Sequence, residues 1–287
     1  MVDIIFMRQM AYPSEKVLLW AITSQEIKHC FDKGDIPQIV LPSIVRKKKQ
    51  PVIAIILAQD SHPDRAEKDY TIFPDYVDAI VMQGGYPIFI AYDKAEEQLA
   101  AAKPDGILLL GGNFRLVKAA NADYEPRPKT YVKMIRYAQE RGLPLFAVCG
   151  GEQMLAVYFG ASVEVNINAG SEKTVMHMQK PYQISHQVNL AEGSQISKIL
   201  QKTTIEVNSC HNTAVIIDKD VGELVVSGVA PDGVIEVVEM KNPWNKDFVI
   251  GAQWHPERLT RMGDADSLKL FSAFIKAALA MKKEMYT

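Results

Sequence analysis

The first fifty residues carry a different hydrophobic pattern from the rest of the chain. A helix is predicted over 14–31 and a short apolar piece over 36–45, and four basic residues follow from Arg46 to Lys49. Such a run is typical of a solvated linker, with a targeting or anion-binding patch as the alternative. The pattern changes sharply at Pro51. Residues 1–50 are therefore interpreted as an amino-terminal extension with a basic linker, and residues 51–287 as the main domain.

From Pro51 onward, apolar strands alternate with amphipathic helices. Residues 51–58 read PVIAIILA, a continuous apolar run of the kind expected for a strand buried on both faces. The next predicted elements are a helix over 69–82, a strand over 87–92, a helix over 95–102, a strand over 106–110, a helix over 129–141 and a strand over 143–148. This alternation predicts an α/β fold with a mostly parallel central sheet flanked by helices, a flavodoxin-like three-layer sandwich.

The second half of the domain is richer in strands, and turn signals such as Pro231-Asp232-Gly233 suggest hairpins. Strands are predicted over 183–190, 205–207, 214–217, 223–229, 234–240 and 248–254, before a last helix over 264–281. Hydrophobic residues make up 48% of the chain, which is enough for a sizeable core.

Charge and cysteine content narrow the classes of function. The net charge of −2 and the pI near 6.3 give no electrostatic basis for binding nucleic acid or an anionic membrane. The 3 cysteines (Cys30, Cys149 and Cys210) form no CxxC pair, so a disulfide framework is not expected. No stretch reaches the roughly 18 apolar residues of a membrane span. A cytoplasmic location is expected.

Residues 144–160 carry the strongest chemical signal. An apolar strand runs into Cys149, then two glycines, then an amphipathic helix. This pattern is typical of a nucleophile elbow, whose sharp turn demands small neighbours. A thiol at a helix amino terminus is biased toward the thiolate. The alternative is a buried structural cysteine followed by an ordinary glycine turn.

A base for this thiol is predicted at the other end of the chain. His255 leaves a predicted strand, and Glu257 follows two residues later across Pro256. Glu257 can accept the second imidazole N–H and fix its tautomer. The backbone N–H groups of Gly150 and Gly112 would form an oxyanion hole, although Gly111-Gly112 could also be a plain turn.

Five segments together resemble the class I glutamine-amidotransferase-like family. They are DGILLLGG (105–112), PLFAVCGGEQ (144–153), VNSCHNTAV (207–215), APDGVIEVVE (230–239) and GAQWHPE (251–257). Their order and spacing match that family, and they are most similar to its γ-glutamyl-γ-aminobutyrate hydrolase branch. The resemblance covers roughly residues 51–280.

The resemblance implies a catalytic triad of Cys149 as nucleophile, His255 as general base and acid, and Glu257 as orienting carboxylate. It also implies substrate-binding roles: Gln153 would contact the glutamyl group, and the backbone of Cys210-His211-Asn212 would bind the glutamyl α-carboxylate. Gly112 and Gly150 complete the predicted substrate site. No metal or cofactor is expected.

Three departures from the branch lie near the expected pocket. Gly150 stands where the branch usually carries arginine, and Phe114 stands where it usually carries aspartate. The usual His-His-Gln becomes His211-Asn212-Thr213. These changes leave the triad intact and bear on substrate choice.

The sequence therefore predicts a hydrolase that cleaves a γ-glutamyl amide through a thioester, with a small-molecule substrate as its partner. A glutaminase subunit that feeds ammonia to a separate synthase and a catalytically silent module of the same fold are the alternatives, and a homodimer is left open. His177 and His186 form a conceivable metal pair, but no third ligand has suitable spacing, so structural roles are favoured.

Overall fold

The computed structural model describes residues 50–61, 68–112, 126–168, 175–217 and 221–284. The predicted amino-terminal extension, with its helix and basic run, lies almost entirely outside these residues, and so does Phe114. No helix among the described residues is long and apolar enough to cross a membrane.

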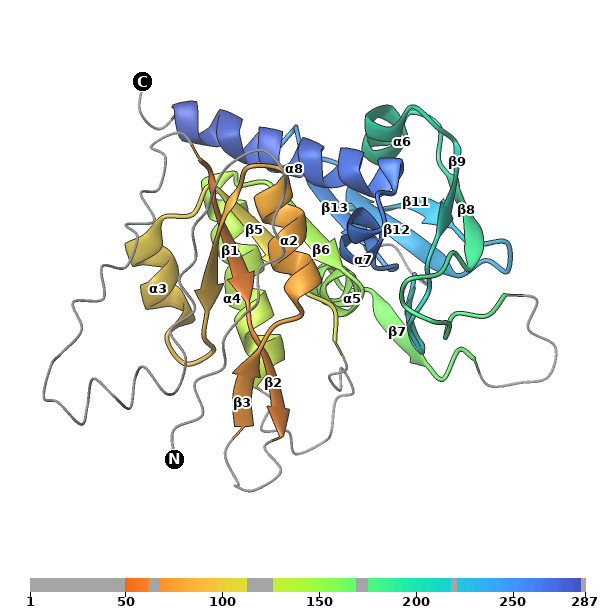
Figure 1. Ribbon diagram of the computed structural model, residues 1–287, viewed down its shortest axis with the longest axis horizontal. Helices are drawn as coiled ribbons and strands as arrows, with labels where there is room; N and C mark the ends of the chain where they lie inside the picture. Colours follow the sequence, from red (N-terminus) through yellow and green to blue (C-terminus); the bar gives the residue numbers. More distant parts are fainter. Residues whose placement is uncertain (1–49, 62–67, 113–125, 169–174, 218–220, 285–287) are drawn as a thin grey trace, which may run out of the picture. The chain divides into compact units, whose positions relative to one another are not determined.

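The domain is built on one 9-stranded sheet that has a parallel half and an antiparallel half (Figure 1). The parallel half runs in the order β4 (Tyr86–Ile90), β1 (Val52–Ile56), β5 (Gly106–Leu109), β6 (Leu145–Val148) and β13 (Val249–Ala252). The antiparallel half continues through β12 (Ile235–Met240), β11 (Leu224–Val229), β8 (His186–Leu190) and β9 (Thr204–Val207). The boundary between the halves falls beside β13, the strand that leads into His255.

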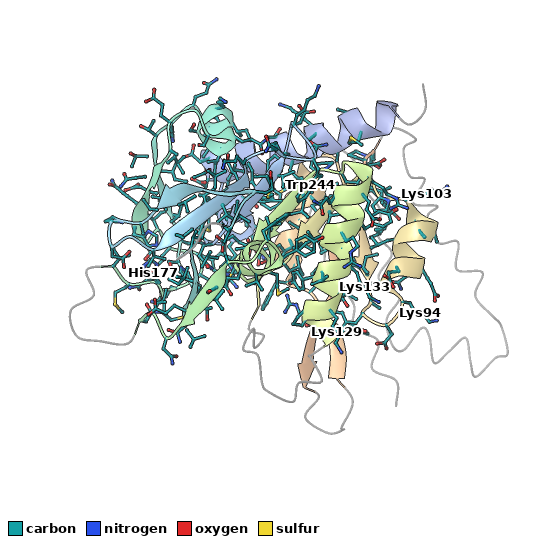
Figure 2. All side chains as sticks on the ribbon, turned by 180° about the vertical axis from the view of Figure 1, so that it is seen from behind. Lys94, Lys103, Lys129, Lys133, His177 and Trp244 are labelled. Carbon is teal, nitrogen blue, oxygen red and sulfur yellow. The ribbon has the colours of Figure 1, made fainter. Side chains whose placement is uncertain are left out.

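Helices cover the sheet in two groups. One group consists of α2 (Pro74–Met82), α6 (Gln195–Leu200), α7 (Pro256–Arg261) and α8 (Ala265–Glu284), with α8 packing on the other three. The second group consists of α3 (Ala95–Ala102), α4 (Pro126–Arg141) and α5 (Gly150–Tyr158), with α4 packing on the other two. Lys133 of α4 reaches Glu96 of α3 at 3.0 Å, on the side seen in Figure 2. The predicted α/β class with a central sheet between helices is confirmed.

The parallel strands are buried because their apolar runs meet helices on both faces. Every residue of β1, β5, β6 and β13 is buried. The ring of Phe146 on β6 packs 5.3 Å from that of Phe248 and 5.1 Å from that of Phe271 on α8, in edge-to-face geometry. Burying each such ring is worth roughly 1.5–3 kcal/mol. The site residues at the ends of these strands are therefore carried on a rigid base.

The start of one predicted helix is corrected by the structure. The helix predicted over 69–82 begins only at Pro74, because residues 68–71 form β3 (Lys68–Thr71), which pairs with β2 (Ala58–Ser61). Proline favours the first turn of a helix, and the aromatic and β-branched residues before it favour a strand.

Besides β2 and β3, three short elements were not predicted. Strand β7 (Ser162–Val165) pairs with β10 (Thr213–Ile216) in a separate small sheet, and α6 and α7 are single short helices. Helices of this length leave too little periodic pattern in the sequence to be recognised.

Candidate active site

Cys149 lies at a sharp turn between β6 and α5. Its backbone has φ 51° and ψ −111°, a conformation that L-residues rarely adopt. The turn is fixed by a hydrogen bond from Cys149 N–H to the carbonyl of Ala252, at 2.7 Å. A Cβ added to Gly151 would lie 2.5 Å from the carbonyl oxygen of Leu109, so only glycine fits there. The geometry is that of the predicted nucleophile elbow.

His255 and Glu257 form a buried pair beside this elbow. Nδ1 of His255 lies 2.7 Å from Oε1 of Glu257, and their exposed fractions are 5% and 0%. A Cβ added to Gly111 would lie 2.8 Å from Cε1 of His255 and 3.0 Å from Cβ of Cys149. The side chains of His255 and Cys149 therefore both lie next to Gly111. The structure brings all three predicted triad residues together.

The electrostatics of this group favour a thiolate–imidazolium pair. Burial alone would raise the pKa of Cys149, but the charge and hydrogen bond of His255 and the backbone N–H of Gly150 lower it below its ordinary value. Burial alone would lower the pKa of His255, but the negative charges of Glu257 and Cys149 raise it. A cysteine with a lowered pKa is the nucleophilic form of the residue.

Asn208 holds the backbone of His255 in place, a role the sequence reasoning did not assign. The N–H of His255 donates to Oδ1 of Asn208 at 2.9 Å, and Nδ2 of Asn208 donates to the carbonyl of His255 at 3.0 Å. Nδ2 also donates to the carbonyl of Pro181 at 2.7 Å. Asn208 lies inside the recognised segment 207–215, but nothing in its local pattern indicated a partner 47 residues away.

A second set of side chains fixes the predicted oxyanion loop after β5. The N–H of Gly111 donates to the hydroxyl of Tyr76 at 2.9 Å, and Arg127 donates to the carbonyl of Gly111 at 2.6 Å. Arg127 also donates to the hydroxyl of Tyr131, which donates to the carbonyl of Leu110 at 2.6 Å. The N–H of Gly111 is therefore engaged, and the predicted pair of oxyanion donors stays Gly112 and Gly150.

Gln153 lies in the first turns of α5, close to the small sheet. Its Nε2 donates to the carbonyl of Thr213 at 2.8 Å and to Oε1 of Gln253 at 3.0 Å. These bonds fix its side chain between the elbow helix and the start of β10. Its predicted contact with a glutamyl group stays a prediction.

Residues 210–212 are held by neighbouring loops, and their predicted role in binding the glutamyl α-carboxylate stays a prediction. The N–H of His211 donates to the carbonyl of His177 at 2.7 Å, so it is occupied by the protein itself. The side chain of Asn212 donates to Oδ1 of Asn166 at 3.0 Å, and half-buried Cys210 forms an isolated bridge with Met178. These contacts tie the segment to neighbouring loops.

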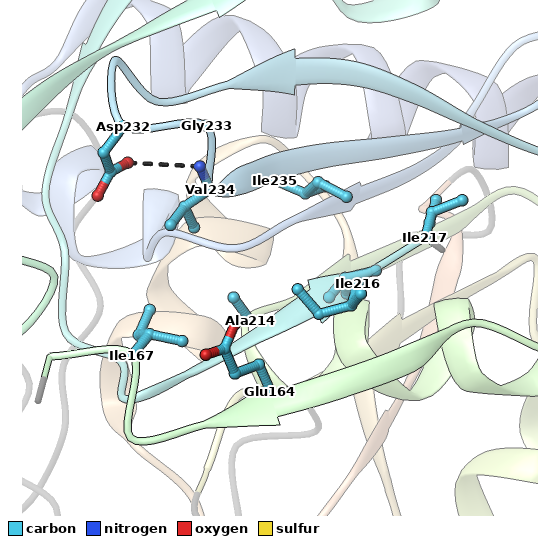
Figure 3. Close-up of a pocket in the computed structure, with 10 residues that line it drawn as sticks. Glu164, Ile167, Ala214, Ile216, Ile217, Asp232, Gly233, Val234 and Ile235 are labelled. Carbon is cyan, nitrogen blue, oxygen red and sulfur yellow. Dashed lines mark hydrogen bonds between the residues drawn. The ribbon is translucent and has the colours of Figure 1, made fainter. Parts of the chain in front are cut away.

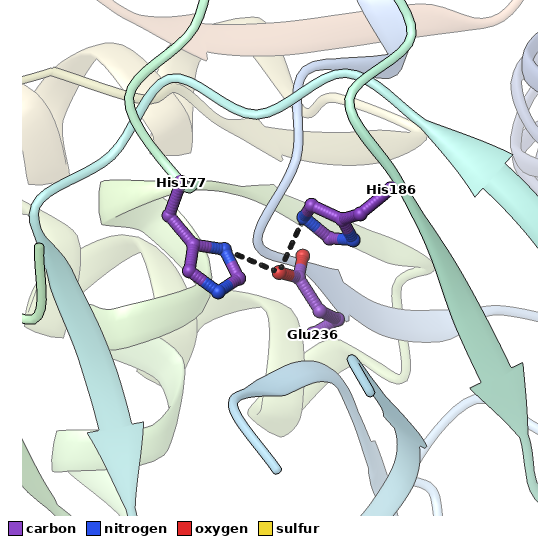
Figure 4. A group of neighbouring side chains, drawn as sticks. All are labelled: His177, His186 and Glu236. Atoms are coloured by element: carbon purple, nitrogen blue, oxygen red, sulfur yellow. Dashed lines mark ion pairs between the residues drawn. The ribbon is translucent and has the colours of Figure 1, made fainter. Parts of the chain in front are cut away.

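Three histidines surround one buried glutamate on β12. The group of His177, His186 and Glu236 has ligand atoms that all lie within 4.8 Å of one another (Figure 4). Glu236 is a third potential ligand that the spacing of the two histidines did not indicate, and the structural role predicted for those histidines stays a prediction. Burial alone would raise the pKa of Glu236, but the three imidazoles of His177, His186 and His211 lower it far below its usual range.

A cavity of about 440 Å³ lies between the small sheet and the turn before β12 (Figure 3). Its lining is mainly aliphatic and includes Ile167, Ala214, Ile216 and Ile235, with the carboxylates of Glu164 and Asp232 at its edge. The triad residues are not part of this lining.

Residues 51–257 match the peptidase C26 family. The chain belongs to this family. It is 31% identical over 245 residues to the γ-glutamyl-γ-aminobutyrate hydrolase of Escherichia coli, covering 79% of this chain and 93% of the relative. It is 33% identical over 211 residues to a Schizosaccharomyces pombe protein that carries the name of a glutamine amidotransferase, covering 70% of this chain and 79% of the relative.

Solved structures agree on the fold. A Thermoplasma acidophilum protein that carries the name of a GMP synthase component matches with a TM-score of 0.56 at 16% identity, covering 83% of this chain and 99% of that one. The predicted resemblance to the class I glutamine-amidotransferase-like superfamily is thereby confirmed.

Proposed function

We propose that this peptidase C26 family member is a cysteine-dependent hydrolase that cleaves a γ-glutamyl amide bond through a thioester. The observation that carries the proposal is the meeting of Cys149, at a strained elbow and with a lowered pKa, with an imidazole held by Glu257. The name of the Escherichia coli relative supports the choice of a γ-glutamyl substrate.

The proposed reaction has two halves. The sulfur of Cys149 attacks the carbonyl carbon of the amide, and the N–H groups of Gly150 and Gly112 stabilise the oxyanion that develops. His255 then gives its proton to the leaving amine, so that the C–N bond breaks and a thioester remains. In the second half His255 takes a proton from water, the hydroxide attacks the thioester, and glutamate leaves as the thiol is restored.

Two alternatives remain distinct from this proposal. A glutaminase subunit would use the same chemistry on glutamine and pass ammonia to a separate synthase, and the fold match to a GMP synthase component makes it worth testing. A silent module of the same fold would hold the triad without turnover.

A panel of γ-glutamyl amides separates the three. Purified protein is incubated with γ-glutamyl-γ-aminobutyrate, a neutral γ-glutamyl alkylamide and glutamine, and released glutamate and ammonia are measured, with Cys149→Ser as the control. Glutamate release from the amides, lost in Cys149→Ser, is the expected result. Preferential turnover of glutamine favours the glutaminase alternative, and no release from any substrate overturns the hydrolase proposal.

A further inference from the structure

The cluster around Glu236 is not used by the proposed reaction. His177 precedes β8, His186 begins β8, His211 follows β9 and Glu236 lies on β12, so the cluster joins separate segments of the antiparallel half. His177 and Glu236 are 0% exposed, and the side chains of His186 and His211 are 5% and 1% exposed. Burying this many ionisable groups costs free energy unless the groups are paired with one another or bind a metal ion.

The outer ring nitrogen of each histidine is already held by an acceptor. Nδ1 of His186 lies 3.0 Å from the carbonyl of Gln187, and Nδ1 of His211 lies 3.1 Å from the carbonyl of Thr213. Nε2 of His177 lies 3.1 Å from Oδ2 of Asp232. In each histidine this contact engages the ring nitrogen that faces away from Glu236, and the other ring nitrogen faces the carboxylate. Metal-ligating histidines almost always have such a partner on the ring nitrogen that faces away from the ion.

The inner ring nitrogens converge on a single carboxylate oxygen. Oε1 of Glu236 lies 3.3 Å from Nδ1 of His177 and 3.3 Å from Nε2 of His186. Nε2 of His211 lies 3.5 Å from the same oxygen. One carboxylate oxygen cannot accept three good hydrogen bonds, and Nδ1 of His177 also lies 3.3 Å from the hydroxyl of Ser209.

These inner atoms also stand out among the buried polar atoms. Within the described residues, both carboxylate oxygens of Glu236 and the Nε2 atoms of His186 and His211 lack a hydrogen-bond partner. An unsatisfied buried polar group of this kind needs a physical reason. A cation at the point they share would bind all of them at once.

Two of the three ligand-atom spacings match a tetrahedral ion, and the third pair lies within 4.8 Å, so the two imidazoles turn toward each other when the ion binds. Zinc bonds to imidazole nitrogen and carboxylate oxygen at about 2.0–2.2 Å, which places neighbouring ligand atoms about 3.3 Å apart in a tetrahedron. The distances from Oε1 of Glu236 to His177 and His186 are both 3.3 Å. A nitrogen-rich set with one carboxylate suits zinc better than calcium or magnesium, which prefer oxygen ligands.

We propose that His177, His186 and Glu236 bind a structural Zn²⁺ ion, with His211 facing the same point as a further nitrogen donor. The ion stabilises the antiparallel half by joining β8, β12 and the loop before β8. Through His211 it also fixes residues 208–213, the segment that contains Asn208.

The triad offers a competing metal site, so the experiment must separate the two. A thiolate and an imidazole also bind zinc, and the metal content is therefore measured in the Cys149→Ser variant with any polyhistidine tag removed. Glu236→Gln and His186→Ala are introduced in that background. Glu239→Gln is the matched control, because Glu239 is a buried glutamate on the same strand whose oxygens accept from the N–H groups of Gln195 and Ile196, both at 2.8 Å.

Zinc chloride is added, excess metal is removed by desalting, and bound zinc and the thermal unfolding midpoint are measured. Cys149→Ser and its Glu239→Gln derivative should each retain about one zinc per chain and unfold at a higher temperature with zinc than without it. Glu236→Gln and His186→Ala should bind zinc at least about 100-fold more weakly and lose the shift in midpoint.

The proposal is overturned if the Cys149→Ser protein binds no stoichiometric zinc. It is also overturned if Glu236→Gln and His186→Ala keep the metal as well as Glu239→Gln does. Zinc that is present in the parent and lost in Cys149→Ser would place the ion at the triad instead. Because the parent-like protein must itself bind the ion, misfolding of a variant cannot rescue the proposal.

Discussion

Asn208 and His255 are joined by a reciprocal pair of hydrogen bonds between the asparagine side chain and the histidine backbone. One runs from His255 N–H to Oδ1 at 2.9 Å and the other from Nδ2 to the His255 carbonyl at 3.0 Å. His255 stands at the junction of β13 and α7, where its own backbone has φ −113° and ψ 76°. The asparagine therefore fixes the point from which the imidazole extends toward Cys149.

Replacing Asn208 by alanine should slow turnover while leaving the fold intact. The change strands the buried N–H and carbonyl of His255, which costs about 1–3 kcal/mol of unfolding free energy, and it lets the imidazole drift from the thiol. Urea unfolding and kcat for glutamate release measure both effects. Asn242→Ala is the control, since Asn242 is exposed and bonds to surface Glu223. Equal losses in the two variants would contradict this role.

Cys149 should react with iodoacetamide faster than Cys30 and Cys210, although Cys149 is buried and Cys210 is half-buried. The pKa of Cys149 is lowered, so its thiolate persists as the pH falls below the ordinary value of 9.0. Its alkylation rate should therefore stay high near neutral pH and fall only at lower pH. Peptide mapping across a pH series provides the measurement.

The matched variant for this profile is His255→Ala. Without the imidazole, burial raises the pKa of the thiol, and the alkylation rate should drop at neutral pH and recover only in alkaline solution. A profile unchanged by the substitution would remove His255 as the cause of activation. Labelling of Cys30 or Cys210 before Cys149 would contradict the assignment of the nucleophile.

His255→Ala and Glu257→Gln should lower kcat to different extents. Removing the imidazole removes proton transfer and should lower kcat by about 10⁶-fold. Removing the charge of Glu257 only weakens the orientation of the imidazole and should lower kcat by about 10²–10⁴-fold. Glu257→Gln alters the hydrogen bond of 2.7 Å between Nδ1 of His255 and Oε1 of Glu257. Steady-state kinetics on one γ-glutamyl amide gives the comparison, and full activity of Glu257→Gln would exclude it from the triad.

Glu152 should make the protein less stable as the pH rises. It is 0% exposed, and burial, Glu236 and Cys149 raise its pKa well above 4.5. Between its unfolded and folded pKa values the folded state holds a proton that the unfolded state has lost, so the free energy of unfolding falls by about 1.4 kcal/mol per pH unit. Glu152→Gln removes this dependence. Urea unfolding from pH 4 to 8 should show the free energy of unfolding of Glu152→Gln rising relative to that of the parent as the pH rises. A constant difference between the two proteins across this range would refute the prediction.

The parallel half of the sheet and the elbow could be predicted because their signals are local. The runs 51–58, 106–110 and 143–148 are continuous and apolar, and Gly151 after the elbow marks a turn where no larger residue fits. The hairpin of β2 and β3 was missed because polar residues such as Lys68 and Asp69 hide its alternation. Pairing with β2 and the β-propensity of Tyr70 and Thr71 make this segment a strand.

The supporting residues of the site could not be predicted, because their partners lie far away in sequence. Glu236 is 59 residues from His177 and reads locally as one more position in a strand. Arg127 reaches the loop after β5 from the start of α4. Such contacts are decided by the topology of the sheet, and a single sequence carries no local pattern for them.

The last prediction concerns the leaving amine, where Gly150 departs from the γ-glutamyl-γ-aminobutyrate hydrolase branch. Glycine leaves out a long cation beside the nucleophile, so the protein should accept neutral γ-glutamyl amides about as well as acidic ones. The glutamyl half should still be required, because Gln153 remains held between Thr213 and Gln253.

Gly150→Arg should shift preference toward γ-glutamyl-γ-aminobutyrate, since a charge-assisted hydrogen bond is worth roughly 1.5–3 kcal/mol. Gly150→Met adds a chain of similar length without charge and is the control. The ratio of kcat/KM for the acidic and neutral substrates should rise by about 10- to 100-fold in Gly150→Arg and stay unchanged in Gly150→Met. A strong preference of the parent for the acidic amide would sink this idea, because the carboxylate would then be recognised without a cation at position 150.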